Sequence, residues 1–176
     1  MNIVNNVNLD EMDKTIEMVR INPEEAKKTV TIEGEWFPQA LTGPQFSAIM
    51  ATEKGDVTLS SDEPTFLGGS GSTLNPIQYC VYGACSCYAA TYAKWAAFEG
   101  VILKNFKIKA TANLDLSRAL GLSQNPVIKE MFFELFVETD ADDEKLAKVE
   151  KIAYDRCPAV YCLTSSVGVK TKVTRL

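Results

Sequence analysis

The residues with the most evident chemistry in this sequence are its five cysteines. Cys80, Cys85 and Cys87 fall in one short stretch, and Cys157 and Cys162 follow much later in the chain. A cysteine thiolate can attack a peroxide oxygen, and a second thiol can then turn the resulting sulfenic acid into a disulfide. This chemistry requires neither histidine nor metal. It is therefore open to this chain, which contains no histidine.

The absence of histidine removes several other kinds of site. It excludes His-based acid–base catalysis, Ser-His-Asp and Cys-His nucleophiles, and histidine ligation of zinc, haem iron or copper. Three cysteines on one rigid helix do not close a tetrahedral zinc shell, so a metal site would also need Cys157 or Cys162. We predict no metal and no cofactor. The net charge of −5 argues against binding to nucleic acid, which needs a basic face.

The three clustered cysteines lie in a stretch that predicts one long helix. Asn75 can cap its start, Pro76 suits the first helical position, and Gly100 suits the left-handed residue after its end. The helix is apolar nearly all round, which is typical of a helix buried on most sides. Because it holds Gln78 and four tyrosines and has no basic flank before it, we predict a core helix and no membrane span.

The other segments predict an α+β fold with antiparallel strands instead of alternating βαβ units. We expect residues 1–26 to form an N-terminal arm that can hold a short helix over 9–19. We expect residues 27–176 to form a single domain. Hydrophobic periodicity predicts strands at 28–36, 46–51, 57–60, 103–115, 127–138 and 167–173, and an amphipathic helix at 140–155.

Three motifs together resemble the OsmC/Ohr family of osmotically inducible and organic-hydroperoxide-resistance proteins. They are LGGSGSTLNP, the run GACSCYAAT in the long helix, and a downstream RCP. The resemblance runs from about Asp62 to the end of the chain, and it is that of a member whose sequence diverges from the family pattern. The family spacing of NP and cysteine selects Cys87, in preference to Cys80 or Cys85, as the peroxidatic cysteine. Cys157 matches the resolving cysteine.

The resemblance implies an OsmC-like fold, with antiparallel sheets packed on the long central helix in an intertwined homodimer. Phe132 and Phe136, on the polar side of the 127–138 strand, are placed to contact a second chain. The resemblance also implies reduction of organic hydroperoxides through a Cys87–Cys157 disulfide, with a dithiol reductant such as a lipoylated protein. We predict Gln78 and Glu63 as substrate-binding residues.

The compartment that we predict is the cytoplasm. The first residues, MNIVNNVNLDEMDK, are acidic and polar and do not resemble a signal peptide. Five cysteines in a chain without an export signal indicate free thiols in a reducing environment.

Two positions depart from the hydroperoxide-reducing members of the family. Those members carry a glutamate after the NP proline, where this chain has Ile77, and an arginine on an early strand. This chain has no arginine between Arg20 and Arg118, although Arg156 adjoins Cys157. The alternative is therefore a catalytically degenerate OsmC-like protein that binds a hydrophobic small molecule or acts as a redox-responsive binding protein. Sulfur or persulfide handling by the several thiols is a third hypothesis for the function.

Overall fold

The computed structural model describes residues 1–39 and 42–175. The chain divides into two compact units, one made of Met1–Met12 with Gly83–Leu176 and the other of Asp13–Tyr82. Helices α1 (Leu9–Ile21) and α2 (Pro76–Phe98) each contribute residues to both units. The helix that the sequence predicts near the N-terminus is confirmed as α1.

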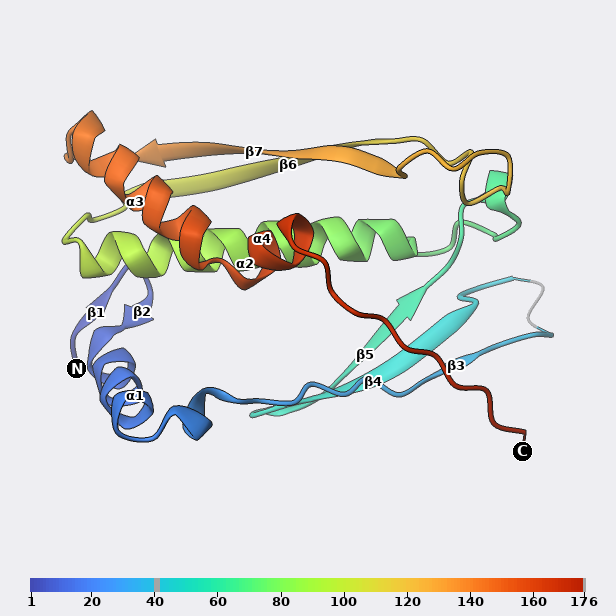
Figure 1. The fold of residues 1–176 in the computed structure, drawn as a ribbon, viewed down its shortest axis with the longest axis horizontal. Coiled ribbons are helices and arrows are strands. Elements are labelled where there is room, and N and C mark those ends of the chain that lie inside the picture. The colour runs from blue at the N-terminus through green and yellow to red at the C-terminus, as the bar shows by residue number, and fades with distance from the viewer. Residues whose placement is uncertain (40–41, 176) are drawn as a thin grey trace. The chain divides into compact units, whose positions relative to one another are not determined.

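The unit of residues 13–82 contains an antiparallel sheet in the order β3–β4–β5 (Figure 1). Its strands are β3 (Gly34–Trp36), β4 (Phe46–Thr52) and β5 (Gly55–Ser61). The predicted β4–β5 hairpin is confirmed. The prediction of a strand from residue 28 is wrong for residues 28–33 of the single chain, which pair with nothing. The unit also has two 3-10 turns, Pro23–Ala26 and Thr65–Leu67.

The Gly/Ser-rich connection after β5 folds around the carboxylate of Asp62, which is buried. Ser70 and Ser72 each donate a backbone N–H and a hydroxyl to this carboxylate, at 2.5–3.4 Å. A Cβ on Gly69 would lie only 1.9 Å from the carbonyl oxygen of Glu63, so the loop requires glycine there. The loop is thereby held close to the start of α2.

Helix α2 begins and ends as the sequence predicts. The side-chain oxygen of Asn75 accepts from the Gln78 backbone N–H at 2.8 Å, and Gln78 Oε1 accepts from the Asn75 N–H at 2.9 Å. This reciprocal pair is a capping box, which satisfies two of the free donors at a helix N-terminus. At the other end Gly100 adopts φ +69°, and the Val101 N–H donates to the Ala96 carbonyl at 2.8 Å.

The unit of residues 1–12 and 83–176 packs a hairpin and a helix against α2. The hairpin pairs β6 (Asn105–Leu114) with β7 (Ile128–Glu138), and the helix is α3 (Asp143–Arg156). Figure 1 shows the hairpin running along α2, with α3 lying obliquely to both. Ring stacking joins α2 to the hairpin, with centroids 5.1 Å apart for Tyr88–Phe133 and for Tyr92–Phe106. The buried core residues are Tyr88, Tyr92, Ala96, Val101, Val149, Ala153, Cys157 and Val160.

The first residues are anchored to the segment that follows α2. Strands β1 (Ile3–Val4) and β2 (Val7–Asn8) pair around Asn5 and Asn6, which both adopt positive φ. The Asn5 side chain donates to the Val101 carbonyl at 2.8 Å and accepts from the Leu103 N–H at 2.8 Å. Residues 1–8 are therefore an ordered part of this unit.

Two features of the C-terminal region differ from the sequence-based expectation. A short helix, α4 (Pro158–Thr164), follows α3 directly, and Pro158 occupies its first position. The strand predicted at 167–173 is absent from the single chain, where these residues are exposed and have no strand partner. The region after α3 therefore holds one short helix that was not predicted and, at 167–173, an unpaired tail where a strand was predicted.

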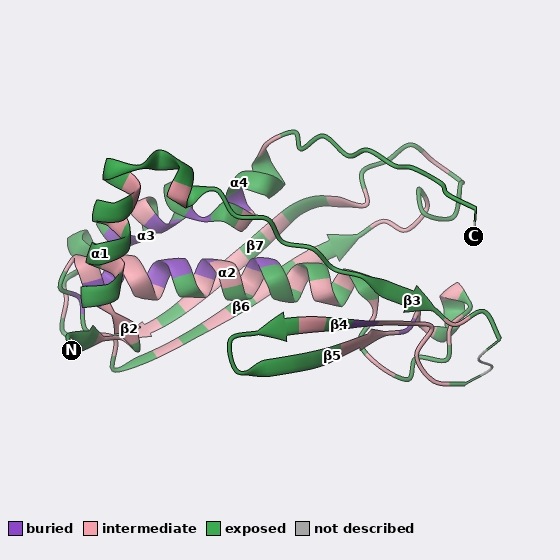
Figure 2. Ribbon diagram, turned by 90° about the horizontal axis from the view of Figure 1, so that it is seen from below, coloured by how far each residue is buried: buried purple, intermediate pink, exposed green. Residues whose placement is uncertain are grey.

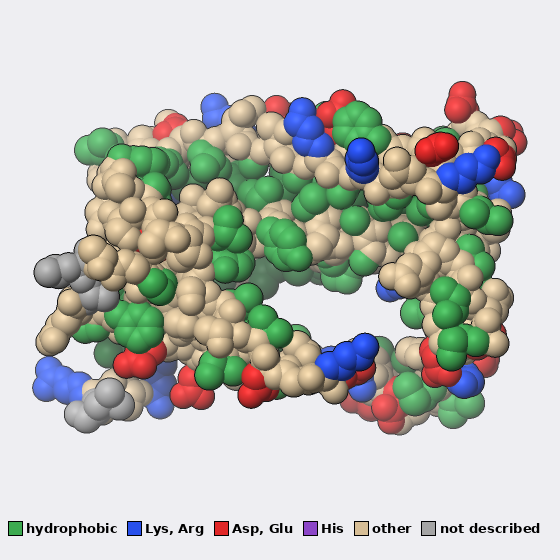
Figure 3. Space-filling view, turned by 180° about the vertical axis from the view of Figure 1, so that it is seen from behind, with side chains coloured by type: hydrophobic (Ala, Val, Ile, Leu, Met, Phe, Trp, Pro, Cys, Tyr) green, Lys and Arg blue, Asp and Glu red, His purple; other side chains and the backbone are tan. Residues whose placement is uncertain are grey.

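The single chain buries only one side of α2 (Figure 2). Its buried residues are Ala84, Tyr88, Thr91, Tyr92, Ala96 and Ala97, whereas Tyr82 is 68% exposed. From behind, hydrophobic side chains gather at the level of α2 (Figure 3). Among the described residues, no helix combines the length and hydrophobicity required to span a bilayer.

Candidate functional site

The structure brings Cys87 and Cys157 together. Their sulfur atoms lie 3.7 Å apart, with the Cys157 thiol donating to Cys87. Cys157 is 1% exposed and belongs to the buried core, whereas Cys87 is only partly buried. Both are free thiols. A disulfide bond is about 2 Å long, so the two sulfurs need to approach by less than 2 Å to form one.

The Cys-Pro dipeptide explains how Cys157 reaches Cys87. Proline disfavours the α region for the residue before it, so α3 ends and Cys157 adopts an extended backbone, with φ −76° and ψ 119°. Pro158 then starts α4, whose first backbone N–H groups have no partner within the helix. One of these, the N–H of Ala159, donates to the Cys87 sulfur.

The Ala159 donor was not predicted from the sequence. The signal for it is the Cys-Pro pair itself, because a proline at the first position of a helix leaves the next N–H groups free. We predicted that this proline ends α3 but not that a second helix begins at it. The group that donates to the Cys87 sulfur is thus a backbone N–H, and the identity of a side chain gives no sign of it.

Burial raises the pKa of the Cys87 thiol above its ordinary value of about 9, and the neighbouring Cys157 raises it further. Two groups act in the opposite direction, namely the backbone N–H of Ala159 and the positive charge of Lys94. Lys94 lies two turns further along α2, on the same helix face as Cys87. At neutral pH the Cys87 side chain is therefore mainly a thiol.

The wall beside the two thiols is aromatic. Tyr88 and Tyr92 are buried, and burial raises the pKa of Tyr88 to about 12 and raises that of Tyr92 as well. Both rings are therefore neutral in the physiological range. The guanidinium of Arg156 lies 4.0 Å from the centre of the Trp95 ring. The Arg156 side chain therefore makes a cation–π contact with Trp95, and the structure shows no contact between it and the thiol pair among the described residues.

Gln78 and Glu63 both lie in the 13–82 unit. The Gln78 side chain accepts from the Asn75 backbone and so completes the cap of α2. The Glu63 backbone lies in the loop around Asp62, with its N–H donating to Gln45 and its carbonyl accepting from Gly71. Each residue therefore has a structural task, and the substrate-binding roles predicted for them remain predictions.

The remaining cysteines do not join the pair. Cys80 and Cys162 are exposed, and Cys85 is partly buried, with a pKa raised by burial. Within residues 1–39 and 42–175, no group of three or more Cys, Asp or Glu side chains is placed to hold a metal ion. The candidate site is therefore a two-thiol centre.

The fold and the site define an α+β protein with a long central helix that carries one thiol of a contacting pair. Residues 69–172 match the sequence profile of the family described as "OsmC-like protein". Because this match spans more than half of the chain, the chain belongs to the OsmC-like family. The resemblance inferred from the sequence motifs is confirmed, and so is the α+β, OsmC-like fold.

Solved structures agree on the fold at low sequence identity. An OsmC-like protein of Vibrio cholerae is 14% identical, with a TM-score of 0.58 over 79% of this chain and 96% of that one. An organic hydroperoxide resistance protein OsmC of Legionella pneumophila is 16% identical, with a TM-score of 0.53 over 78% and 92%. An OsmC-like protein of Mycoplasma pneumoniae is 15% identical, with a TM-score of 0.54 over 78% and 88%. No curated protein matches the sequence significantly.

Proposed function

We propose that this protein is a thiol-dependent peroxidase that reduces organic hydroperoxides in oxidative-stress defence. The observation that carries the proposal is the 3.7 Å contact between the Cys87 and Cys157 sulfur atoms. The partial exposure of Cys87 suits it to meet a substrate, and the burial of Cys157 suits it to receive the sulfenic acid. The solved relative from Legionella pneumophila, named an organic hydroperoxide resistance protein, supports the substrate class.

The reaction follows from the two thiols alone. The Cys87 thiolate attacks one peroxide oxygen, the O–O bond breaks, and the alkoxide takes a proton and leaves as an alcohol. Cys87 is now a sulfenic acid. The Cys157 thiol attacks its sulfur, water leaves, and a Cys87–Cys157 disulfide forms. A dithiol reductant, such as a lipoylated protein, then restores both thiols through a mixed disulfide.

One backbone group and one side chain assist the first step in this scheme. The Ala159 N–H donates to the Cys87 sulfur and Lys94 places a positive charge on the same side, so both favour the thiolate over the thiol. They act against burial, which favours the thiol. The proposed peroxidase therefore works with a thiolate that forms only in part at neutral pH.

The proposed protein is a cytoplasmic homodimer. The exposed side of α2 and the outward Phe132 and Phe136, which are 62% and 51% exposed, support a second copy as the partner. In this proposal the dimer closes an apolar pocket over Cys87. Gln78 and Glu63 stay as the proposed substrate-binding residues.

The test is consumption of cumene hydroperoxide with dihydrolipoamide as reductant. Wild-type protein is expected to turn over repeatedly. Cys87→Ser is expected to lose at least about a hundredfold in rate, because no other thiol in the described part of the chain contacts a second thiol that could resolve it. Cys80→Ser, which alters an exposed cysteine of the same helix, is the matched control and is expected to keep full activity. Equal rates for wild type and Cys87→Ser would reject the proposal.

One observation favours a second function, the binding of a hydrophobic small molecule. The 13–82 unit contains an apolar cavity of about 380 Å³, lined by β4 and β5 and by residues that include Ile32, Trp36 and Tyr79. A cavity of this size and character fits a small apolar ligand. An activated nucleophile needs a lowered pKa, so the raised pKa of Cys87 fits this binding function better than it fits catalysis.

A further inference from the structure

The unit of residues 1–12 and 83–176 contains a cavity of its own. It lies between β7 and α3, has a volume of about 530 Å³, and has an apolar lining that includes Phe133, Leu135 and Leu146. Neither Cys87 nor Cys157 lines it. A cavity of this size takes a small organic molecule. The thiol chemistry makes no use of this space.

The hydroxyl of Tyr92 is an unpartnered polar group in this cavity. The Tyr92 side chain is only 2% exposed, and its ring is held by stacking on Phe106 of β6. The hydroxyl makes no hydrogen bond within the described part of the chain, where no side-chain nitrogen or oxygen is both fully buried and without a partner. It therefore reaches the open space of the cavity that Tyr92 lines. A hydroxyl in this position is free to bond to a bound molecule.

Two carboxylates on α3 give the cavity its charge. Asp143 and Glu150 both line it, and neither forms an ion pair with a described residue. The other carboxylate in the lining, Glu134, is paired with Lys109 at 3.6 Å. Among the described residues, no lysine or arginine lines the cavity. A molecule that enters it therefore meets negative charge that the protein does not neutralise, which favours a cation.

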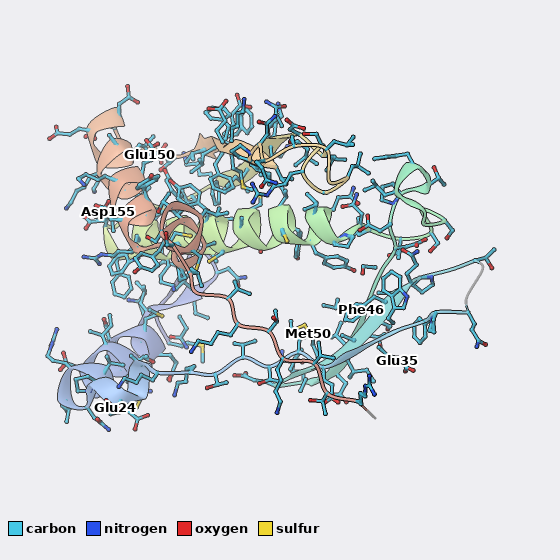
Figure 4. The ribbon with its side chains drawn as sticks, turned by 45° about the vertical axis from the view of Figure 1, so that its right-hand side comes forward. Glu24, Glu35, Phe46, Met50, Glu150 and Asp155 are labelled. Carbon is cyan, nitrogen blue, oxygen red and sulfur yellow. The ribbon has the colours of Figure 1, made fainter. Side chains whose placement is uncertain are left out.

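The spacing of these two carboxylates selects the shape of the cation. Glu150 follows Asp143 by seven positions, so both lie on one face of α3, about 10 Å apart along its axis. Leu146 and Ala147 line the cavity between them. Figure 4 shows Glu150 on the flank of α3 that faces the hairpin, with Asp155 on another side of the helix. The α3 wall of the cavity thus presents an acid, an apolar stretch and a second acid in turn.

We propose that this cavity binds a linear aliphatic amine that carries an ammonium group at each end, one at Asp143 and the other at Glu150. An extended chain of about eight methylene groups spans the distance between the two carboxylates and packs on the apolar stretch between them. Burial and the charge of Glu150 raise the pKa of Tyr92, so the hydroxyl and this carboxylate are neighbours and one ammonium group bonds to both. The site stands independently of the peroxidase proposal.

Titration calorimetry of the full chain with 1,8-diaminooctane tests the site. The titration is made at pH 7 in about 150 mM salt, which screens attraction between exposed charges. Wild type is expected to bind the diamine at a single site per chain. Octylamine, which has the same length but only one ammonium group, should bind at least about tenfold more weakly. Octanoate, an anion of the same length, should not bind.

Three variants locate the binding. Asp143→Asn/Glu150→Gln keeps the shape of both side chains but removes both charges, so the affinity should fall at least about thirtyfold. Tyr92→Phe keeps the stacked ring but removes the hydroxyl, so the affinity should fall at least about threefold. Glu130→Gln/Glu144→Gln is the matched control, because it removes the same net charge from exposed residues that do not line the cavity. This control should bind as wild type does.

Several results would overturn the proposal. One is the absence of diamine binding to wild type. Another is equal affinity for octylamine, because the second carboxylate would then have no role. An equal loss of affinity in the control variant would show that the diamine is held by the net charge of the chain. Unchanged affinity in Asp143→Asn/Glu150→Gln or in Tyr92→Phe would show that the diamine binds elsewhere.

Discussion

The chemistry at the residue scale depends on the balance of forces on the Cys87 sulfur. Burial and the adjacent Cys157 favour the thiol, and the Ala159 N–H and Lys94 favour the thiolate. The result is a pKa above the ordinary value of about 9. Activated cysteines of other proteins have pKa values that are lowered instead. The single chain therefore holds the two thiols in contact but does not strongly activate the nucleophile.

This balance predicts the pH dependence of Cys87. Below its pKa the thiolate fraction rises about tenfold per pH unit, so alkylation of Cys87 by iodoacetamide should rise steadily from pH 7 to pH 9 without a plateau. Site-resolved mass spectrometry separates Cys87 from the exposed Cys80, which serves as the internal control. Rapid alkylation of Cys87 well below pH 7 would contradict the raised pKa and would also remove one of the two supports for the binding-protein alternative.

The family resemblance selected two thiols, whose catalytic roles stay a prediction, and it did not predict their surroundings. The spacing around the NP and RCP motifs selects Cys87 and Cys157, and the structure places these two sulfurs in contact. The Ala159 donor follows from a helix start that only the backbone reveals. The partner of Arg156 depends on how α3 packs against Trp95, which is a tertiary contact that local sequence does not determine.

The element scale is where the sequence predicted most. The ends of α2 depend on local signals, namely a cap at Asn75 and a left-handed residue at Gly100, and both were found as predicted. The β4–β5 and β6–β7 pairs follow from alternation. The segments 28–33 and 167–173 carry the same signal and yet stay unpaired, because alternation predicts a half-buried strand but does not supply its partner.

The Asp62 loop gives a prediction for acid stability. Hydrogen bonds from Ser70 and Ser72 lower the pKa of Asp62 from 3.8 to about 2. Between these values the unfolded chain binds the proton and the folded chain does not, so this contribution is complete above about pH 4 and is lost as the pH falls toward 2. Denaturant unfolding between pH 2 and pH 5 should show the loss in wild type.

Asp62→Asn should remove this part of the pH dependence and should destabilise the chain at pH 5. An amide cannot accept from all the donors that the carboxylate binds, so the variant should unfold at lower denaturant. Asp56→Asn, which changes an exposed carboxylate of β5, is the control and should behave as wild type. If the unfolding free energy of Asp62→Asn fell between pH 5 and pH 2 as steeply as that of wild type, the stability of the loop would not depend on the charge of Asp62.

At the scale of the whole molecule, the single chain leaves apolar surface and sheet edges uncovered. One side of α2 is exposed, the outward phenylalanines of β7 are exposed, and two strand-like segments lack partners. Large apolar patches are rare on the surface of monomeric soluble proteins, and the exposed apolar residues are therefore what supports the proposed homodimer. Which surfaces a partner covers lies outside what local patterns in one sequence specify.

The central claim is that Cys87 and Cys157 form one redox unit. The most direct test adds one equivalent of cumene hydroperoxide to the reduced protein and maps the disulfides by mass spectrometry. We expect two of the five thiols to be lost, with a single Cys87–Cys157 disulfide. In Cys157→Ser we expect a Cys87 sulfenic acid, trapped by dimedone, and no disulfide. Oxidation that leaves Cys87 and Cys157 reduced, or that pairs either with another cysteine, would contradict the account.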